Sequence, residues 1–165
     1  MKIIKINKKN QKGFSLIEMM VVVVVLGLIV LGLVTFFTGG AKSWVAGQSQ
    51  LEAQRNARQA IDRMVREIRH GNLMTSKLEH SISVSIPELN GSAYNVKYSW
   101  SGTPGGSINR EVSGVSNIVI DNVKTLKFTY PDESKVRILL EVDVDDDGNA
   151  DITLNTDVNL RNFGL

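Results

Sequence analysis

The sequence predicts an α+β protein in which one long N-terminal helix packs on an antiparallel β-sheet. An apolar run over residues 14–37 is much longer than any single strand needs. Residues 41–71 continue with apolar positions at helical spacing, and residues 72–165 alternate between apolar and polar positions. With 165 residues, the chain has room for one domain and an anchor.

The composition excludes several classes of function. Cysteine is absent, which rules out disulfides, thiolate zinc sites, iron–sulfur clusters and thiol nucleophiles. The two histidines, His70 and His80, are accompanied by no nucleophile, phosphate-binding loop or metalloprotease motif. We therefore predict that the protein is not an enzyme and that both histidines are surface residues.

Charge is divided unevenly along the chain. Five lysines and no acid occupy the first thirteen residues, and without them 14 basic residues face 17 acidic ones, a net charge of −3 for residues 14–165. The arginines between residues 55 and 69 are interrupted by Asp62 and Glu67 and have no aromatic neighbour for base stacking. We interpret them as a solvated or subunit-facing surface, and nucleic acid is not an expected partner.

The apolar run over residues 14–37 predicts a membrane-spanning helix. A helix of that length extends roughly 36 Å, against about 30 Å of bilayer hydrocarbon. A secretory signal has a shorter core, of about 7–15 residues, and a clear cleavage site. An ordinary signal anchor explains the lysines and the length, but it leaves Glu18 unexplained, because a carboxylate at the bilayer centre costs at least ~2.5 kcal/mol.

A short basic leader that ends in glycine precedes this run, and a phenylalanine and a glutamate follow the glycine at fixed spacing. The segment is Lys12-Gly13-Phe14-Ser15-Leu16-Ile17-Glu18-Met19-Met20-Val21. It resembles the processing site of type IV prepilins and of the pseudopilins of type II secretion. A chance match in a single-pass anchor is the alternative.

The resemblance implies specific roles for three residues. A membrane aspartic peptidase would cut between Gly13 and Phe14, and the new N-terminus at Phe14 would be N-methylated. Glu18 would then meet the Phe14 amine of a neighbouring subunit during assembly. Such a pair is physically reasonable, because each charge offsets the burial cost of the other.

The resemblance also implies an organisation, a location and a set of partners. Residues 1–13 would be the leader, 14–40 the transmembrane and filament-core helix, 41–71 an amphipathic helix and 72–165 the β-rich body. The precursor would cross the bacterial cytoplasmic membrane once, with its N-terminus inside and its body outside, before joining an extracellular or periplasmic filament. Its partners would be other pilin-like subunits, the prepilin peptidase, the inner-membrane assembly platform and, before assembly, membrane lipid.

The second part of the helix is predicted to be amphipathic and to end before Gly71. Apolar residues recur at helical spacing: Ala57, Ile61, Met64, Val65 and Ile68. Asp62 with Arg66 and Arg63 with Glu67 stand four residues apart and can pair along the helix surface.

The body is predicted to contain four to seven antiparallel strands. The alternating runs are Ile82–Ile86, Tyr94–Trp100, Leu126–Tyr130, Val136–Val144 and Ile152–Leu160, with turn signals at Asn90-Gly91, residues 102–106, Pro131-Asp132 and Asp147-Gly148. Residues 101–116 have the weakest pattern and are expected to form a flexible loop. Trp44 is expected to be an interfacial anchor and Trp100 a core aromatic residue.

A cluster of acidic residues near the C-terminus has the pattern of a calcium-binding loop. Asp143, Asp145, Asp147, Asn149 and Asp151 offer oxygen ligands at alternate positions around Gly148, which suits a sharp turn. The glutamate usual at the twelfth position is replaced by Leu154. Calcium is therefore one interpretation, and a tight Asp-Gly hairpin whose acids serve solubility is the other.

These observations favour a structural subunit of a type IV pilus or type II secretion pseudopilus. The arginine-rich helix and the lack of a cysteine-closed loop resemble the larger minor subunits, of the J-like or W-like kind, and Glu18 argues against the tip subunit, which typically lacks that glutamate. The alternative is a membrane-anchored calcium-binding adhesin or receptor module that never polymerises.

Overall fold

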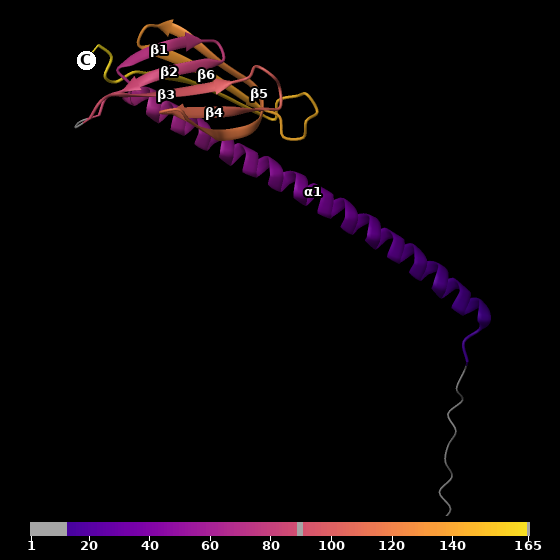
Figure 1. Cartoon of the computed structure of the whole chain (residues 1–165). Helices are drawn as coiled ribbons and strands as arrows, with labels where there is room; N and C mark the ends of the chain where they lie inside the picture. Colours follow the sequence, from indigo (N-terminus) through magenta and orange to yellow (C-terminus); the bar gives the residue numbers. More distant parts are fainter. Residues whose placement is uncertain (1–12, 89–90, 165) are drawn as a thin grey trace, which may run out of the picture. The chain divides into compact units, whose positions relative to one another are not determined.

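The computed structural model describes residues 13–88 and 91–164. One helix is followed by seven strands (Figure 1): α1 (Leu16–His70), β1 (Leu73–Leu78), β2 (Ser81–Ile86), β3 (Tyr94–Trp100), β4 (Gly106–Val112), β5 (Val115–Asp132), β6 (Lys135–Val142) and β7 (Ile152–Asn159). The predicted α+β class, a long N-terminal helix on an antiparallel sheet, is confirmed. The basic leader, except for Gly13, and Asn90 of the predicted Asn90-Gly91 turn lie outside the described residues.

The chain divides into two compact units, Met1–Val45 and Ala46–Leu165. The first contains the apolar part of α1, and all its described side chains are exposed. The threonine hydroxyls in this part donate hydrogen bonds to backbone carbonyls of the preceding helical turn. Thr35 Oγ1 donates to the Gly32 carbonyl at 2.9 Å, and Thr38 Oγ1 donates to the Val34 carbonyl at 2.8 Å. Such bonds let a hydroxyl lie in apolar surroundings without an unpaired donor.

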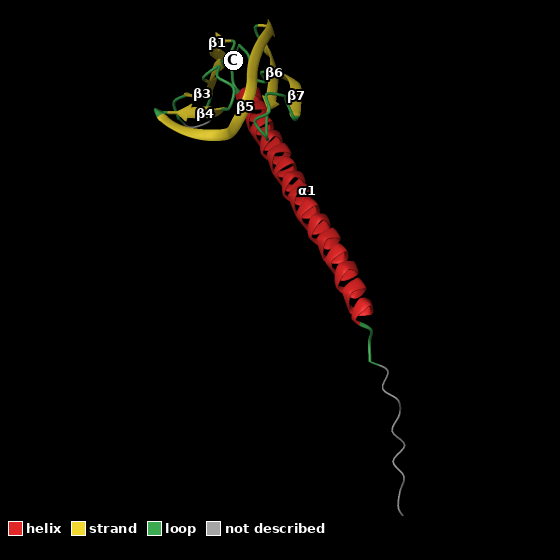
Figure 2. Ribbon diagram, turned by 90° about the vertical axis from the view of Figure 1, so that its right-hand side faces the viewer, coloured by secondary structure: helices red, strands yellow, loops and turns green. Residues whose placement is uncertain are grey.

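The second unit, which we call the body, contains the rest of α1 and the whole sheet. The strands follow one another in space in the order β1-β2-β3-β4-β5-β6-β7, and all neighbours are antiparallel. Figure 2 shows β1 and β7 on opposite sides of the sheet. Consecutive pairing of this kind needs only short connections. One register is important for the acidic loop: Val142, at the end of β6, faces Ile152, at the start of β7.

The core of the body lies between one face of the sheet and one stripe of α1. The helix contributes Ala57, Ala60, Ile61, Met64 and Ile68, all buried. Alternate residues of the strands supply the other side, and the side chains with the least exposure include Ile82, Val96, Tyr98, Ile108, Leu126, Val136, Ile138 and Leu140. The apolar side chains that recur at helical spacing in α1 and those that alternate along the strands therefore pack into one core.

The end of α1 is held by residues far along the chain. After β7, the Arg161 N–H donates to the Arg69 carbonyl at 2.8 Å, and the Asn162 side-chain amide donates to the His70 carbonyl at 3.1 Å. These bonds satisfy carbonyls that a helix end leaves unpaired. Gly71 follows directly, and a Cβ on it would lie 2.0 Å from Val84 Cγ1, so close packing against β2 requires glycine there.

The prediction of a flexible loop over residues 101–116 is wrong. This segment contains β4 and the start of β5, joined by Ser113 and Gly114 with φ of 51° and 82°. Positive φ at both central residues is the mark of a type I′ hairpin turn, which Ser-Gly signals only weakly. Most β4 side chains are partly buried, without clear alternation, so the sequence pattern is weak even though β4 is paired on both sides, by β3 and β5.

Of the two tryptophans and two histidines, three have the exposure expected from the sequence and His80 does not. Trp100 is buried and Trp44 is exposed, and His70 is exposed as expected. His80 is half-buried, contrary to the expectation of a surface residue. Its Nδ1 lies 2.8 Å from the Leu126 carbonyl, and its ring packs edge-on against Trp100 with the centroids 5.2 Å apart.

Candidate functional sites

The predicted processing bond lies in non-helical backbone just before α1. Gly13, Phe14 and Ser15 precede the first helical residue, Leu16, and all three are exposed. A Cβ placed on Gly13 would meet no atom within 4 Å. A peptidase that binds its substrate as an extended strand can therefore reach this bond, and nothing in the described chain itself requires glycine at position 13.

Glu18 caps the start of the helix. Its Oε2 accepts a hydrogen bond from the Ser15 N–H at 2.8 Å. With Ser15 as the N-cap and Glu18 as the third helical residue, Ser15-Leu16-Ile17-Glu18 has the spacing of a capping box. Our sequence reasoning missed this role, although the S-x-x-E pattern is a signal for it. The carboxylate also lies where the positive end of the helix dipole favours a negative charge.

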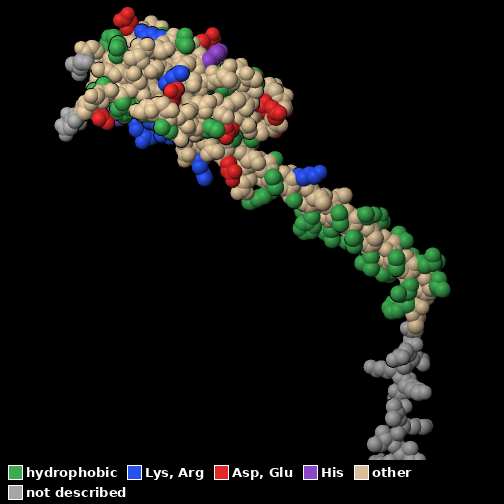
Figure 3. Space-filling model, viewed as in Figure 1, with side chains coloured by type: hydrophobic (Ala, Val, Ile, Leu, Met, Phe, Trp, Pro, Cys, Tyr) green, Lys and Arg blue, Asp and Glu red, His purple; other side chains and the backbone are tan. Residues whose placement is uncertain are grey.

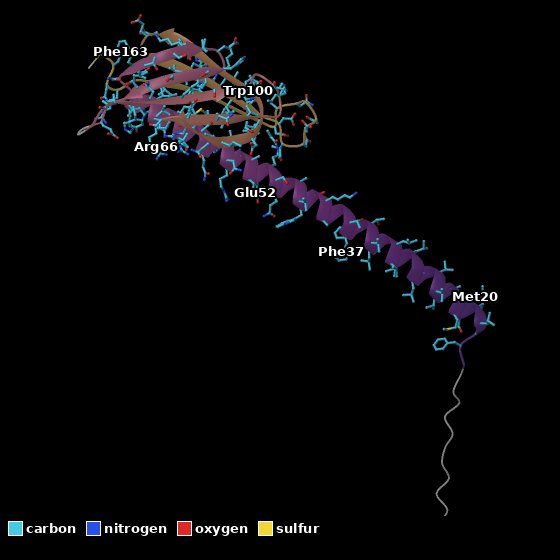
Figure 4. The ribbon with its side chains drawn as sticks, viewed as in Figure 1. Met20, Phe37, Glu52, Arg66, Trp100 and Phe163 are labelled. Carbon is cyan, nitrogen blue, oxygen red and sulfur yellow. The ribbon has the colours of Figure 1, made fainter. Side chains whose placement is uncertain are left out.

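Phe14 and Glu18 belong to one apolar surface patch at this end of the helix. They line it together with Ile17, Val21 and Val22. Phe14 is 81% exposed, and side chains such as Met20 and Phe37 project outward along the helix (Figure 4). Within the part of the chain that the structure describes, α1 is the one helix long and apolar enough to cross a membrane.

Hydrophobic side chains cover this part of α1 on the visible face, whereas acidic and basic groups are spread over the body (Figure 3). A monomeric soluble protein rarely exposes so continuous an apolar surface, which usually marks a membrane or protein partner. Residues 13–45, the described part of the first unit, therefore have the surface of a segment that is covered by lipid or by other subunits.

The acidic loop 143–151 connects β6 to β7 and is not a tight hairpin. β6 ends at Val142 and β7 begins at Ile152, so the predicted two-residue Asp-Gly alternative is wrong. The loop brings together three of the five predicted ligand residues. One carboxylate oxygen from each of Asp143, Asp145 and Asp151 lies within 4.8 Å of the others, close enough for a shared ion.

The other two predicted ligands, Asp147 and Asn149, are hydrogen-bonded to each other, and Asp147 is not one of the three clustered carboxylates. Asp147 Oδ1 accepts from the Asn149 N–H at 2.7 Å, and its Oδ2 accepts from the Asn149 side-chain amide at 3.0 Å. These bonds lower the pKa of the Asp147 carboxyl. The pKa of Asp145 is raised instead, by partial desolvation and by the negative charges of Asp147, Asp151 and Asp143.

The comparisons with known proteins concern the N-terminal segment. Residues 8–34 match the family model described as the prokaryotic N-terminal methylation motif. The match spans the predicted processing bond, Glu18 and most of the apolar run, and it does not extend into the body. No curated protein and no solved structure matches the chain.

Proposed function

We propose that this chain is a member of the type IV pilin and pseudopilin family that is cut, methylated and assembled into a helical filament. The N-terminal methylation motif and the long apolar helix before an antiparallel sheet support this proposal. The family consists of structural, non-enzymatic proteins. Cleavage between Gly13 and Phe14 would create the new N-terminus, and Phe14 would carry the methyl group. The partners would be other pilin-like subunits, the prepilin peptidase and the assembly platform of the inner membrane.

The observation that carries this proposal is the combination of a fully exposed apolar helix with a carboxylate at its start. Every described side chain from residue 13 to residue 50 is exposed, and Glu18 is the one acidic residue among them. Lipid can cover the apolar side chains, but it offers no charge partner for Glu18. An N-terminal ammonium from a neighbouring subunit would both pair this carboxylate and bring two apolar helices together.

Orientation follows from the charges at the two ends of the apolar run. The five leader lysines favour the cytoplasmic side of the inner membrane, so the body would lie outside. Before assembly the precursor would be held by lipid, and afterwards the apolar helices would form the filament core. We propose a minor component, of the J-like or W-like kind, because no cysteine closes a loop in the C-terminal part of the chain.

The acidic loop adds a cofactor to this proposal, a calcium ion held by the body. Three carboxylates that have no ion pair among the described residues, with one oxygen of each within 4.8 Å of the others, support it. The body would meet calcium outside the inner membrane, where weak sites of extracellular modules bind at about 10⁻⁴–10⁻³ M.

Filament membership can be tested with a tagged chain in cells that make filaments. We expect the mature chain to co-purify with sheared filaments, and intact-mass spectrometry should give a mass that starts at Phe14 and includes one methyl group. Tagged chain that stays in the membrane fraction, while filaments form normally, would contradict the proposal. That result would favour a membrane-anchored module that does not polymerise.

A further inference from the structure

We infer that Asp143, Asp145 and Asp151 bind one calcium ion, which fixes the β6–β7 loop against the neighbouring strand β5. The inference rests on the cofactor proposed above and does not depend on filament assembly. It differs from the sequence pattern, in which Asp147 and Asn149 are also ligands. Two of the carboxylates come from the start of the loop and one from its end, so one ion would tie the two ends together.

The first observation is a buried oxygen that lacks a partner. Asp143 is 9% exposed, and its Oδ2 accepts a hydrogen bond from the Gly148 N–H at 2.8 Å. Its other oxygen, Oδ1, is buried and has no hydrogen-bond partner among the described residues. A buried carboxylate oxygen without a partner is costly, because it has lost its hydration and gained nothing in return.

The second observation is that no basic side chain neutralises this cluster. Among the ion pairs of the described residues, none involves Asp143, Asp145 or Asp151. The orphan oxygen of Asp143 and the two exposed carboxylates therefore form a concentrated negative charge. A divalent cation would supply the charge that the protein lacks there and would give Asp143 Oδ1 a ligand bond.

The dimensions of the cluster suit calcium. Calcium–oxygen bonds are about 2.3–2.6 Å long, so two oxygens on opposite sides of one ion lie up to about 5 Å apart. The three carboxylate oxygens are already within 4.8 Å of one another. Magnesium has bonds of about 2.0–2.1 Å and strict octahedral geometry, which would require the loop to contract more.

Asp147 and Asn149 are not needed for this site. Both oxygens of Asp147 already accept hydrogen bonds from Asn149, and a new ligand bond would have to replace them. Gly148, with φ of +84°, turns the chain so that its N–H reaches Asp143. The outer part of the loop therefore supports Asp143, while the ligands come from its inner part.

The position of the site tells what the ion would stabilise. The Asp143 N–H donates to the carbonyl of Asn122 in β5 at 3.2 Å, and Asn122 has a positive φ of 56° at an irregular point of that strand. At the other end of the loop, Asp151 and Ile152 line a groove together with Gly47, Gln50, Leu51 and Gln54 of α1. An ion between Asp143 and Asp151 would thus hold the start of β7 near β5 and β6.

Calcium titration of the detergent-solubilised full-length chain tests this inference by isothermal calorimetry after removal of metals. We expect one ion per chain with a dissociation constant in the range of about 10⁻⁴–10⁻³ M. Asp145→Asn and Asp151→Asn should weaken binding at least about tenfold, because each removes a ligand charge next to the ion. Asp146→Asn and Asp147→Asn remove the same charge from the same loop and should change affinity by less than about threefold.

The variants separate the possible results. Equal losses for Asp145→Asn and Asp147→Asn would overturn the three-carboxylate site and favour the longer ligand set of the sequence pattern. An absence of binding up to about 10 mM calcium would overturn the site entirely. If Asp143→Asn fails to fold, Asp145→Asn and Asp151→Asn still test the calcium site, because both residues are exposed and their substitution should leave the fold intact. Filament assembly plays no part in the measurement, so its failure in cells would leave this result intact.

Discussion

Glu67 of α1 and Arg110 of β4 form an ion pair that joins the helix to the sheet. Arg110 Nε donates to Glu67 Oε2 at 2.8 Å and to Oε1 at 3.1 Å, and the Tyr98 hydroxyl donates to Oε2 at 2.6 Å. Arg63 adds a longer contact of 3.5 Å within the helix. Although burial alone would raise the pKa of Glu67, the hydrogen bonds from Arg110 and Tyr98 hold it below its ordinary value. Burial raises the pKa of the Tyr98 hydroxyl, and its hydrogen bond to the Glu67 carboxylate raises this pKa further.

Glu67→Gln should therefore destabilise the body at neutral pH. Loss of charge-assisted hydrogen bonds to Arg110 and Tyr98 should lower the free energy of unfolding by about 2 kcal/mol. Chemical unfolding of the full chain in detergent, followed by tryptophan fluorescence, measures it. Arg63→Gln is the control, since its side chain is half exposed and its contact is long, and it should cost less than about 0.5 kcal/mol.

The same pair predicts a pH dependence of stability. The pKa of Glu67 is depressed in the folded state, so its contribution is present above the ordinary value of 4.5 and is lost as the pH falls through the lower folded value. The difference in unfolding free energy between wild type and Glu67→Gln should shrink steadily below about pH 4.5. A difference that stays constant down to pH 3 would show that the carboxylate charge contributes nothing.

Gly71→Ala should destabilise the body because of one close contact. The added Cβ would lie 2.0 Å from Val84 Cγ1, and relief requires β2 or the end of α1 to shift. We expect a loss of about 1–3 kcal/mol, as for overpacked cores. Gly47→Ala is the matched control: nothing lies within 4 Å of its Cβ, and alanine in a helix should gain up to about 1 kcal/mol. Equal effects of the two substitutions would contradict the packing role.

Gly13→Val should leave the precursor uncut while the chain still folds. Position 13 has open space around a Cβ in the described chain, so a defect in processing must arise in the peptidase, where a branched side chain would crowd an extended substrate. Immunoblots of cells with an active prepilin peptidase should show only the longer precursor. Normal cleavage of Gly13→Val would show that the peptidase does not read this residue.

Glu18→Val should be inserted and cut but not assembled. Valine suits the bilayer better than a carboxylate, whereas the ammonium of Phe14 in a neighbouring subunit would lose its partner in an apolar core. The matched control is Ser15→Ala, which keeps the Ser15 N–H bond to Glu18 and its charge. The amount of each variant in sheared filaments, compared with that of wild type, measures incorporation. If Glu18→Val enters filaments as well as wild type does, the carboxylate is not the docking group.

The sequence by itself determined the elements whose residues carry their own periodicity. The apolar run, the amphipathic stripe through Ala57, Met64 and Ile68, and the alternation in β2, β3, β6 and β7 each state which face is buried. The N-terminal methylation motif over residues 8–34 could also be recognised locally, because such motifs are short linear segments.

Only the tertiary structure decided what depends on partners distant in the chain. β4 is a strand because β3 and β5 pair with it, and its own residues show little alternation. Glu67 could be assigned to Arg63 from spacing, yet its shorter bond goes to Arg110, 43 residues away. In the acidic loop, spacing proposed five ligands, while the folded backbone drew three carboxylates together and paired Asp147 with Asn149. Periodicity records burial, but pairing across the chain is set by how the strands and the helix pack.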